Sequence, residues 1–404
     1  MKILLANSTA YPVIGGVENS LSNIGRELIR AGHEVKVFCF QFSPDEPMRM
    51  EHEGIEIIRH PCMPERWPHN QFLSRVAVAK QVIPSILNEF QPDTVWSRAA
   101  SVGLGIRQGG FKGSLLQIFP TSARMNCLGT FLQTYGLPAW RRLMLLGLWP
   151  TAYFVSVRIE RELSRQCESV AFSDNIREQL LMEFPVDARP CHKIPPGVDC
   201  EVFSPDNGAR FFQFIENEYG LSRSEPIVLY VGRLSCAKNI PLLMDAVLAM
   251  ENGAKLVLVG SGPEESRLRA YAQRIGLSEN IVFAGLQHEK LPGFYAISSV
   301  CVLPTTIESF GQVYLESLAS GTPVVGFAGD GRRVLTATDE IVRDGVTGFV
   351  VHEVNFRALA EKIDLIISLD SKVYADMAKH ARDDVRSRFS WCDFVDKALT
   401  LSVT

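Results

Sequence analysis

Short apolar runs alternate with helical patterns along the chain, and this order restricts the fold more than any other feature. The run Lys2–Asn7 ends in polar residues and precedes Gly15, Gly16 and a stretch whose apolar residues share one helical face. Gly32 ends that stretch, and the next apolar run is Glu34–Phe40. Two parallel strands need a crossover connection, so the order strand, helix, strand predicts a parallel sheet.

The same order restarts in the second half of the chain. A segment rich in turn formers, Lys193–Pro205, follows the first series, and Pro226–Gly232 opens the second. A single hydrophobic core stops growing at about 250–300 residues, so two series in 404 residues indicate two domains. We expect an α/β protein with two doubly wound Rossmann-like domains, over residues 1–205 and 222–387.

Such domains bind ligands beyond the carboxyl ends of their strands. If the two sheets face each other, these ends line a cleft between the domains. The loops that follow strands are therefore where we look for functional residues.

Composition excludes several classes of protein. The charged fraction is 21% and the formal net charge is -4, which argues against nucleic-acid binding through bulk charge. The nine cysteines form no CxxC pair, which is typical of reduced thiols in a cytoplasmic protein. The eight histidines are scattered without HxxxH or DxD clusters, so we expect no metal site. The dinucleotide fingerprint GxGxxG is missing after the first strand, which counts against NAD, and we expect no other cofactor.

The stretch "TTIESFGQVYLESLASGTPVV" (Thr305–Val325) predicts a helix directly after a strand. Ser309 and Gln312 have the spacing of a capping box, and the helix is expected to end near Ser320, before a glycine and a proline. The first turn of a helix has free N–H groups and a positive dipole end. This helix start is therefore a candidate anion site.

Two glutamates flank that helix start. Glu308 lies in the loop and Glu316 in the second turn. If a phosphate occupied the helix end, Glu308 would lie beside a sugar and Glu316 beside a ribose, because carboxylates accept paired hydrogen bonds from hydroxyl groups. The alternative from these residues alone is a capped helix with a solvated glutamate on its outer face.

The loop "GRLSCAKN" (Gly232–Asn239) follows another strand and carries Arg233 and Lys238. A pyrophosphate needs cations near its oxygens; arginine can bind it with two hydrogen bonds, while lysine acts as a point charge. The alternative is two surface cations in a loop. The position at the end of a strand favours a ligand site.

Gly15 and Gly16 in "YPVIGGVEN" would let the backbone approach a ligand closely before a helix begins. A single Gly-Gly pair is weak evidence. The stretch "GSGPEE" (Gly260–Glu265) is equally weak, since it fits an ordinary turn between a strand and a helix.

Taken in order, "GGVE", "GRL…KN", "GSGPE", "ESFGQVYLE" and "GTPVV" resemble the retaining glycosyltransferases of the GT-B class known as family 4, or glycosyl transferases group 1. "IPPGVDCEVFSP" and "VRDGVTGFVV" also match. The resemblance implies transfer of a sugar, without a metal, from a UDP- or GDP-sugar to a hydroxyl acceptor: a glycan, a lipid-linked molecule or a small molecule. Polysaccharide or glycolipid biosynthesis is the implied context. "RFSW" implies that a last helix, residues 388–404, crosses back to the first domain.

The resemblance also implies roles for individual residues. In such enzymes the first glutamate of the pattern faces the donor sugar and the second holds the ribose, which here are Glu308 and Glu316. The loop cations that bind the donor diphosphate correspond to Arg233 and Lys238. Glu308, Arg233 and Lys238 are thus the expected catalytic set. The expected donor-binding residues are Gly15, Gly16, Gly232, Ser309, Phe310, Gly311 and Glu316.

One departure from the family concerns the first domain. Such enzymes often carry a histidine in the loop after a strand near residue 120, but here that loop is "FPTSARMN" (Phe119–Asn126). No histidine lies between His69 and His192. We expect Arg124 or Ser122 to contact the sugar or the acceptor instead.

Two other functions remain open from the sequence. A non-catalytic nucleotide-sugar binder could use the same residues, and slow hydrolysis of a nucleotide sugar would distinguish an enzyme from it. A glycoside hydrolase would need its two carboxylates on either side of a glycosidic bond. Glu316 lies instead on a helix near cations suited to phosphate, which disfavours a hydrolase.

The apolar stretch Trp140–Arg158 has two interpretations. Its arginines flank an apolar run, a pattern that can bind an anionic membrane surface at the inner membrane face. The run is apolar on all sides, whereas an interfacial helix has a polar face. We therefore favour a buried helix in a cytoplasmic protein, with peripheral membrane contact as the alternative.

Overall fold

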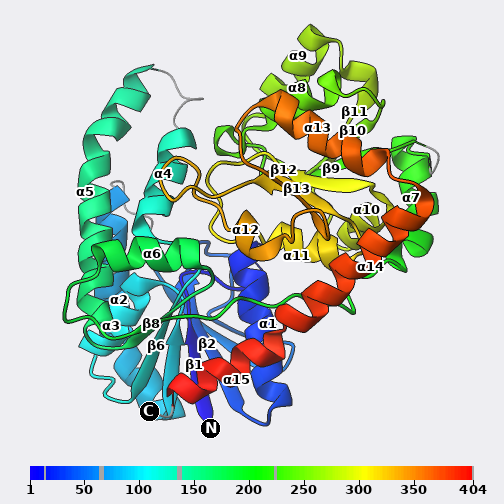
Figure 1. The fold of residues 1–404 in the computed structure, drawn as a ribbon. Helices are drawn as coiled ribbons and strands as arrows, with labels where there is room; N and C mark the ends of the chain where they lie inside the picture. The colour runs from blue at the N-terminus through cyan, green and yellow to red at the C-terminus, as the bar shows by residue number, and fades with distance from the viewer. Residues whose placement is uncertain (13–14, 63–67, 134–138, 223–224, 403–404) are drawn as a thin grey trace. The chain divides into compact units, whose positions relative to one another are not determined.

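The computed structural model divides the chain into two compact units (Figure 1). Within the described ranges, one unit holds residues 1–131, 139–197 and 391–402, and the other holds residues 132–133 and 198–390. The division at residue 197 lies before the expected end of the first domain at 205. The structure describes residues 1–12, 15–62, 68–133, 139–222 and 225–402.

The first unit contains an eight-stranded sheet in the order β3-β4-β2-β1-β5-β6-β7-β8. All neighbouring pairs are parallel except β3 with β4. The central strands carry almost only buried residues, as expected for a sheet covered on both faces. The strands are β1 (Lys2–Ala6), β2 (Glu34–Gln41), β3 (Arg49–His52), β4 (Ile55–Pro61), β5 (Thr94–Ser97), β6 (Ser114–Phe119), β7 (Glu168–Ala171) and β8 (Cys191–Lys193).

Helices cover this sheet, and the last helix of the chain is one of them. Helix α15 packs against α1 and β6, and the Trp96 indole N–H donates to Ser402 Oγ at 2.7 Å. On the other face, α2 and α3 pack over a core that includes Phe38 and Ile83. The helices are α1 (Gly16–Arg30), α2 (Pro68–Phe90), α3 (Ala100–Gln108), α4 (Ala123–Gln133), α5 (Ala139–Ser164), α6 (Asp174–Glu183) and α15 (Trp391–Ser402).

The second unit contains a six-stranded parallel sheet in the order β11-β10-β9-β12-β13-β14. Consecutive strands run outward from β9 in one direction and outward from β12 in the other, so the sheet is doubly wound. The predicted fold class is confirmed for each unit. The strands are β9 (Ile227–Val231), β10 (Lys255–Val259), β11 (Ile281–Gly285), β12 (Val300–Leu303), β13 (Val324–Phe327) and β14 (Gly348–Val351).

Helices lie on both faces of the second sheet, with α8, α9 and α13 on one side and α7, α10, α11 and α14 on the other (Figure 1). Both layers bury apolar residues against the strands. The helices are α7 (Asn207–Tyr219), α8 (Ile240–Ala249), α9 (Glu265–Ile275), α10 (Leu291–Ile297), α11 (Gln312–Ala319), α12 (Thr338–Ile341), α13 (Phe356–Ile367) and α14 (Ser371–Arg388).

Glycines bring the carboxyl ends of β9 and β10 close together. The Gly232 N–H donates to Val259 O at 2.9 Å, and a Cβ atom at Gly260 would lie 2.0 Å from Gly232 O. Gly232 and Gly260 have φ angles of 150° and 141°, which side chains rarely permit. The two loops can therefore leave the sheet side by side only with glycine at these positions.

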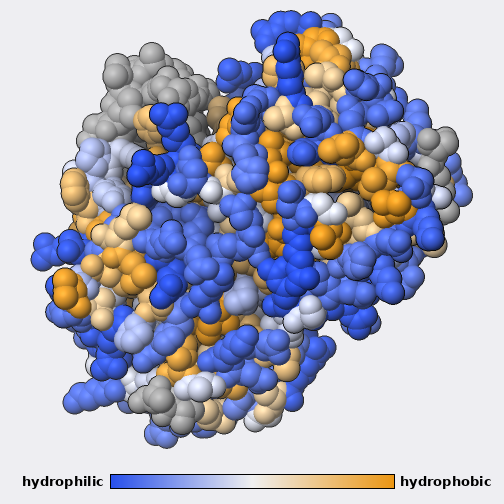
Figure 2. Space-filling model, viewed as in Figure 1, coloured by the Kyte–Doolittle hydropathy of each residue, from blue (hydrophilic) through white to orange (hydrophobic). Residues whose placement is uncertain are grey.

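Hydrophilic side chains cover much of each unit on the face shown in Figure 2, with apolar residues exposed between them. Within the described ranges, no helix is both long and apolar enough to cross a membrane. The expected segment Trp140–Arg158 falls within α5, and the side chains of residues 140–148 lie outside the described residues. Past them, Phe154 is 68% exposed whereas Ile159 is buried.

Candidate active site

The loops after β9 and β12 are joined at the carboxyl end of the second sheet. Lys238 Nζ lies 2.6 Å from Glu308 Oε2, and Asn239 Nδ2 donates to Pro304 O at 3.2 Å. Strands β9 and β12 are direct neighbours, so the loops that follow them start side by side. The structure thus brings together two residues that the sequence places in one expected catalytic set.

Both members of the Lys238–Glu308 ion pair are partly buried, with 24% and 21% of the side chains exposed. Reduced solvent screening strengthens attraction between the charges, while desolvation opposes it. In this pair, the Glu308 carboxylate holds the Lys238 ammonium group at the carboxyl ends of the strands. An incoming anion could compete with Glu308 for Lys238.

Tyr230, the fourth residue of β9, anchors the loop after β9 through a hydrogen bond. Its hydroxyl donates to Arg233 O at 3.1 Å. Burial, reinforced by the negative charge of Glu308, raises the pKa of Tyr230 well above its ordinary value. The phenol therefore stays protonated and remains a donor. Sequence reasoning missed Tyr230, because a tyrosine in a buried strand reads as core.

Arg233 is exposed, and its guanidinium makes no hydrogen bond or ion pair within the part of the chain that the structure describes. Its backbone follows Gly232, at the point where β9 ends. Arg233 and Lys238 therefore belong to the same loop. The Arg233 guanidinium has no partner among the described residues, and Lys238 is paired with Glu308.

The loop that carries Glu308 is held by an isolated parallel bridge. The Glu308 N–H donates to Leu335 O at 2.9 Å, and the Leu335 N–H donates to Thr306 O at 2.7 Å. Phe310 is 5% exposed, and its ring centroid lies 6.0 Å from that of Phe389. Because the Phe310 ring belongs to the core, only its backbone is available for the donor contact expected of it.

Helix α11 begins at Gln312, with Gly311 as its N-cap and no side-chain capping hydrogen bond. The N-cap of the helix is therefore Gly311 and not Ser309, the position predicted from the capping-box spacing. Gly311 adopts a left-handed conformation with φ at 98°, and this turn delays the helix start by two residues. A Cβ atom at Gly311 would lie 2.7 Å from the Tyr314 ring. The helix still follows the β12 loop, so its first N–H groups stay beside Glu308.

Glu316 lies in the second turn of α11, as predicted. The Tyr295 hydroxyl donates to Glu316 Oε2 at 2.7 Å. Burial raises the pKa of Glu316 to about 7, and the bond from Tyr295 opposes this shift. Tyr295 comes from α10, and nothing in its sequence position indicates that it would meet Glu316.

In the first unit, Gly15 is the N-cap of α1, which begins at Gly16. The Thr9 hydroxyl donates to Glu18 Oε1, and the Asn19 N–H donates to Gly15 O at 2.9 Å. A Cβ atom at Gly15 would lie 2.6 Å from Glu18 Oε2. The absence of a side chain at Gly15 thus makes room for the Glu18 carboxylate.

Arg98, directly after β5, is a buried cation that sequence reasoning missed. It is 4% exposed, its Nη1 donates to Ser20 Oγ at 2.6 Å, and its guanidinium lies 5.5 Å from the Phe172 ring centroid. Burial lowers the pKa of Arg98 to about 10, against the opposing charge of Glu18. Arg98 therefore stays charged at neutral pH beside the start of α1.

Ser122 has a structural position at the start of α4. It is fully buried, accepts from the Met125 N–H at 3.1 Å and donates to Gln179 Oε1 at 3.0 Å. Its hydroxyl is thus occupied in capping the helix. Arg124, the other expected acceptor contact, is partly exposed.

A buried carboxyl group, that of Glu160, and a partly buried one, that of Glu183, lie near this helix start, and no sequence signal pointed to them. The Ala123 N–H donates to Glu160 Oε2 at 3.4 Å, and the Tyr153 hydroxyl donates to Glu183 Oε1 at 2.5 Å. Burial, assisted by the charge of Glu183, raises the pKa of Glu160 to about 8. Glu160 is therefore largely protonated at neutral pH.

Solved structures that superpose on this chain identify its fold. Sucrose-phosphate synthase of Thermosynechococcus elongatus superposes with a TM-score of 0.80 over 99% of this chain and 98% of its own, at 22% identity. HepE of Anabaena, in complex with UDP and glucose, superposes with a TM-score of 0.74 over the whole of both chains, at 20% identity. The fold is that of the GT-B glycosyltransferases.

Two family models match successive parts of the chain. Glycosyltransferase Family 4 matches residues 14–202, and Glycosyl transferases group 1 matches residues 211–384. A GDP-mannose-dependent alpha-(1-6)-phosphatidylinositol monomannoside mannosyltransferase of Mycolicibacterium smegmatis is 26% identical over 96% of this chain and 95% of its own. The chain belongs to the family 4 glycosyltransferases of group 1, and the resemblance stated from its motifs is confirmed.

Proposed function

We propose that the protein transfers a hexose from a nucleotide-diphosphate sugar to a hydroxyl acceptor, with retention of anomeric configuration and without a metal. The observation that carries this proposal is the Lys238–Glu308 pair at 2.6 Å, set at the carboxyl ends of two adjacent parallel strands. Arg233 on the same loop and the start of α11 add donors for a diphosphate.

The donor diphosphate would bind between Arg233, Lys238 and the first N–H groups of α11. As the bond from the sugar to the diphosphate breaks, negative charge grows on the leaving oxygen, and fixed cations there stabilise the transition state. The acceptor hydroxyl forms its new bond on the face that the diphosphate leaves, and its proton passes to the departing diphosphate. The bond to the diphosphate is thus replaced by the bond to the acceptor, and no further reactant is needed.

The ion pair suggests how Glu308 joins the reaction. When the diphosphate takes Lys238 as its counter-ion, Glu308 becomes free to accept hydrogen bonds from hydroxyl groups of the donor sugar. The ion pair holds both side chains near their working positions before the donor arrives. Such preorganisation lowers the cost of binding.

Glu316 is proposed to hold the ribose, since a carboxylate can accept from two adjacent hydroxyl groups. Tyr295 fixes the orientation of Glu316 through Oε2. Gly232, Ser309, Phe310 and Gly311 would contribute to the donor site mainly through their backbone. Gly15 and Gly16 are proposed to lie near the phosphates and the acceptor.

The mycobacterial relative is named for GDP-mannose, so we propose GDP-mannose as the first donor to test. A screen should compare GDP- and UDP-sugars by the rise in melting temperature, because a ligand that binds only the folded state stabilises it. The stabilising donor is then incubated with candidate acceptors, free sugars and glycolipid headgroups alike. The proposal would be contradicted if no sugar nucleotide in the screen gave either stabilisation or release of GDP or UDP, or if stabilisation came without hydrolysis or transfer.

A further inference from the structure

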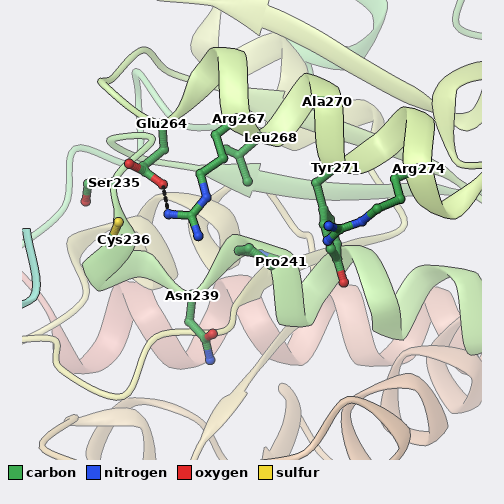
Figure 3. A pocket seen from close by; sticks show the side chains of 10 residues that line it. All are labelled: Ser235, Cys236, Asn239, Pro241, Glu264, Arg267, Leu268, Ala270, Tyr271 and Arg274. Atoms are coloured by element: carbon green, nitrogen blue, oxygen red, sulfur yellow. Dashed lines mark hydrogen bonds and ion pairs between the residues drawn. The ribbon is translucent and has the colours of Figure 1, made fainter. Parts of the chain in front are cut away.

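A cavity lies in the second unit, lined by α8, α9 and the loop after β9 (Figure 3). Its volume is about 590 Å³, within the range of small-molecule sites. Neither Arg233 nor Lys238 lines it, so it is separate from the proposed diphosphate position. Among its lining residues are Asn239, Pro241, Glu264, Arg267, Leu268 and Arg274.

The cavity carries a net positive charge on one helix face. Arg267, Tyr271 and Arg274 have the spacing i, i+4, i+7 on α9, which places them along one side of the helix. Arg267 pairs with Glu264 at 3.2 Å. The Arg274 guanidinium lies 4.8 Å from the Tyr271 ring centroid, and no carboxylate among the described residues forms an ion pair with it. Asp245 accepts a hydrogen bond from the Tyr271 hydroxyl at 2.5 Å, so a carboxylate lies at this end of the cavity, but among the described residues it forms no ion pair with Arg274.

An apolar surface separates the two guanidinium groups. In the view of Figure 3, Leu268 and Pro241 lie between Arg267 on one side and Arg274 with Tyr271 on the other. Leu268 is 3% exposed, so its side chain forms part of a fixed floor. A ligand that filled the cavity would meet positive charge at its ends and an apolar surface in the middle.

We infer that this cavity is a second binding site, for a small organic anion: a phosphate ester with an apolar ring. Arginine binds phosphate oxygens with two parallel hydrogen bonds. Arg274 would bind the phosphate directly, and Arg267 would exchange its Glu264 partner for it. The ring of such a ligand would pack against Pro241 and Leu268. A bare sugar would leave this apolar floor unfilled, and a cation would be repelled.

A ligand in this cavity would touch the turn that presents Lys238. Ser235, Cys236 and Asn239 line the cavity, and the Lys238 N–H donates to Ser235 O at 3.0 Å. Lys238 in turn contacts Glu308. Binding on one side of this turn therefore changes the free energy of binding on its other side, and such coupling is reciprocal. The site goes beyond the proposed transfer reaction and would regulate it.

Phenyl phosphate is a suitable probe, titrated into the intact protein by calorimetry. We expect saturable binding that is weakened at least about tenfold by Arg267→Ala and by Arg274→Ala, the scale of losing a hydrogen bond to a charged group. Arg269→Ala is the matched control, because Arg269 lies on the same helix but pairs with Glu265 outside the cavity. Phenol and inorganic phosphate should each bind more weakly than phenyl phosphate.

A second measurement tests whether phenyl phosphate binds in the donor site instead of the cavity. Phenyl phosphate should still bind to an Arg233→Ala/Lys238→Ala double variant, which lacks the cations proposed for the donor. Loss of binding in this variant would place the probe in the donor site and overturn the inference. Equal affinities in the Arg267, Arg269 and Arg274 variants, equally tight binding of inorganic phosphate, or no saturable binding would overturn it too. None of these outcomes depends on the identity of the donor sugar.

Discussion

At the scale of single residues, the candidate site holds charged side chains that already have partners and, beside them, Arg233, which has none among the described residues. Lys238 is held by Glu308, and Glu316 is held by Tyr295. A bound donor would replace Glu308 as the partner of Lys238. Because Arg233 and Lys238 are proposed to stabilise the departing diphosphate, the loss of either one should act mainly on the transition state.

Arg233→Ala and Lys238→Ala are each expected to lower kcat by about a hundredfold or more, the scale seen when one stabiliser of a developing negative charge is removed. Steady-state kinetics with a saturating donor measure this effect. Lys372→Ala, an exposed lysine at the start of α14, serves as a control and should retain normal turnover. Near-normal turnover in both site variants would rule out the diphosphate role.

Glu316→Ala should mainly weaken donor binding, as measured by calorimetric titration. An unchanged donor affinity would show that Glu316 does not hold the ribose. The variant also loses the acceptor for the Tyr295 hydroxyl, so Tyr295→Phe is the matched control. Tyr295→Phe should retain most donor affinity, because the carboxylate itself remains.

Donor binding should also depend on pH through Glu316. With its pKa raised to about 7, the carboxyl group gains a proton as pH falls through 7 and then loses acceptor capacity for the ribose. Donor KM is therefore expected to rise below pH 7 in the wild type and to stay flat in Glu316→Gln. The same raised pKa makes the ionised form unfavourable in the folded state, so this group's contribution to stability declines as pH rises from about 4.5 to 7. A KM profile identical in both proteins would refute the assignment.

At the scale of secondary-structure elements, the start of α11 depends on backbone geometry. Gly311→Ala places a side chain at φ 98° and against the Tyr314 ring, so it should lower the free energy of unfolding by roughly 1–3 kcal/mol. Denaturant unfolding measures the change. Gly253→Ala is the control, because nothing lies within 4 Å of a Cβ atom there. Equal stability of the two variants would mean that the Gly311 turn relaxes without cost.

The α11 start also shows where a local pattern loses to tertiary context. The spacing of Ser309 and Gln312 fits a capping box, yet Gly311 caps the helix. The β12 loop is held by the Leu335 bridge and by the buried Phe310 ring, and these contacts carry the chain past Ser309 before the helix begins. A pattern of three neighbouring residues carries no information about contacts with residues far away in the sequence.

At the scale of the whole molecule, the proposed chemistry relies on protein cations rather than a metal. Activity is therefore expected to survive incubation with EDTA, measured as donor turnover before and after treatment. Abolition of activity by EDTA, with recovery on adding a divalent ion, would indicate a different class of transferase.

The apolar segment Trp140–Arg158 leads to another test at this scale. We favour a helix packed within the protein, so the protein should stay at the bottom of a flotation gradient with anionic liposomes at low salt. Flotation that is reversed by salt would instead support peripheral membrane contact. It would also make a lipid-linked acceptor the better proposal.

The sequence by itself determined the fold class and the loops that carry the candidate site. Buried strands read as apolar runs and helices as periodic stripes, so their alternation predicts doubly wound sheets without knowledge of contacts. Arg233, Lys238 and Glu308 could be placed at strand ends for the same reason, and the family motifs supplied the roles proposed for them.

Only the tertiary structure decided which side chains meet. Lys238 and Glu308 are 70 residues apart in the chain and touch because β9 and β12 are neighbours in the sheet. The order of strands depends on how whole helices pack across the sheet, and no local apolar pattern encodes it. The contact of Tyr295 with Glu316 and the burial of Arg98 follow from that packing. The sequence alone therefore could not predict the positions of Tyr295 and Arg98 in the site.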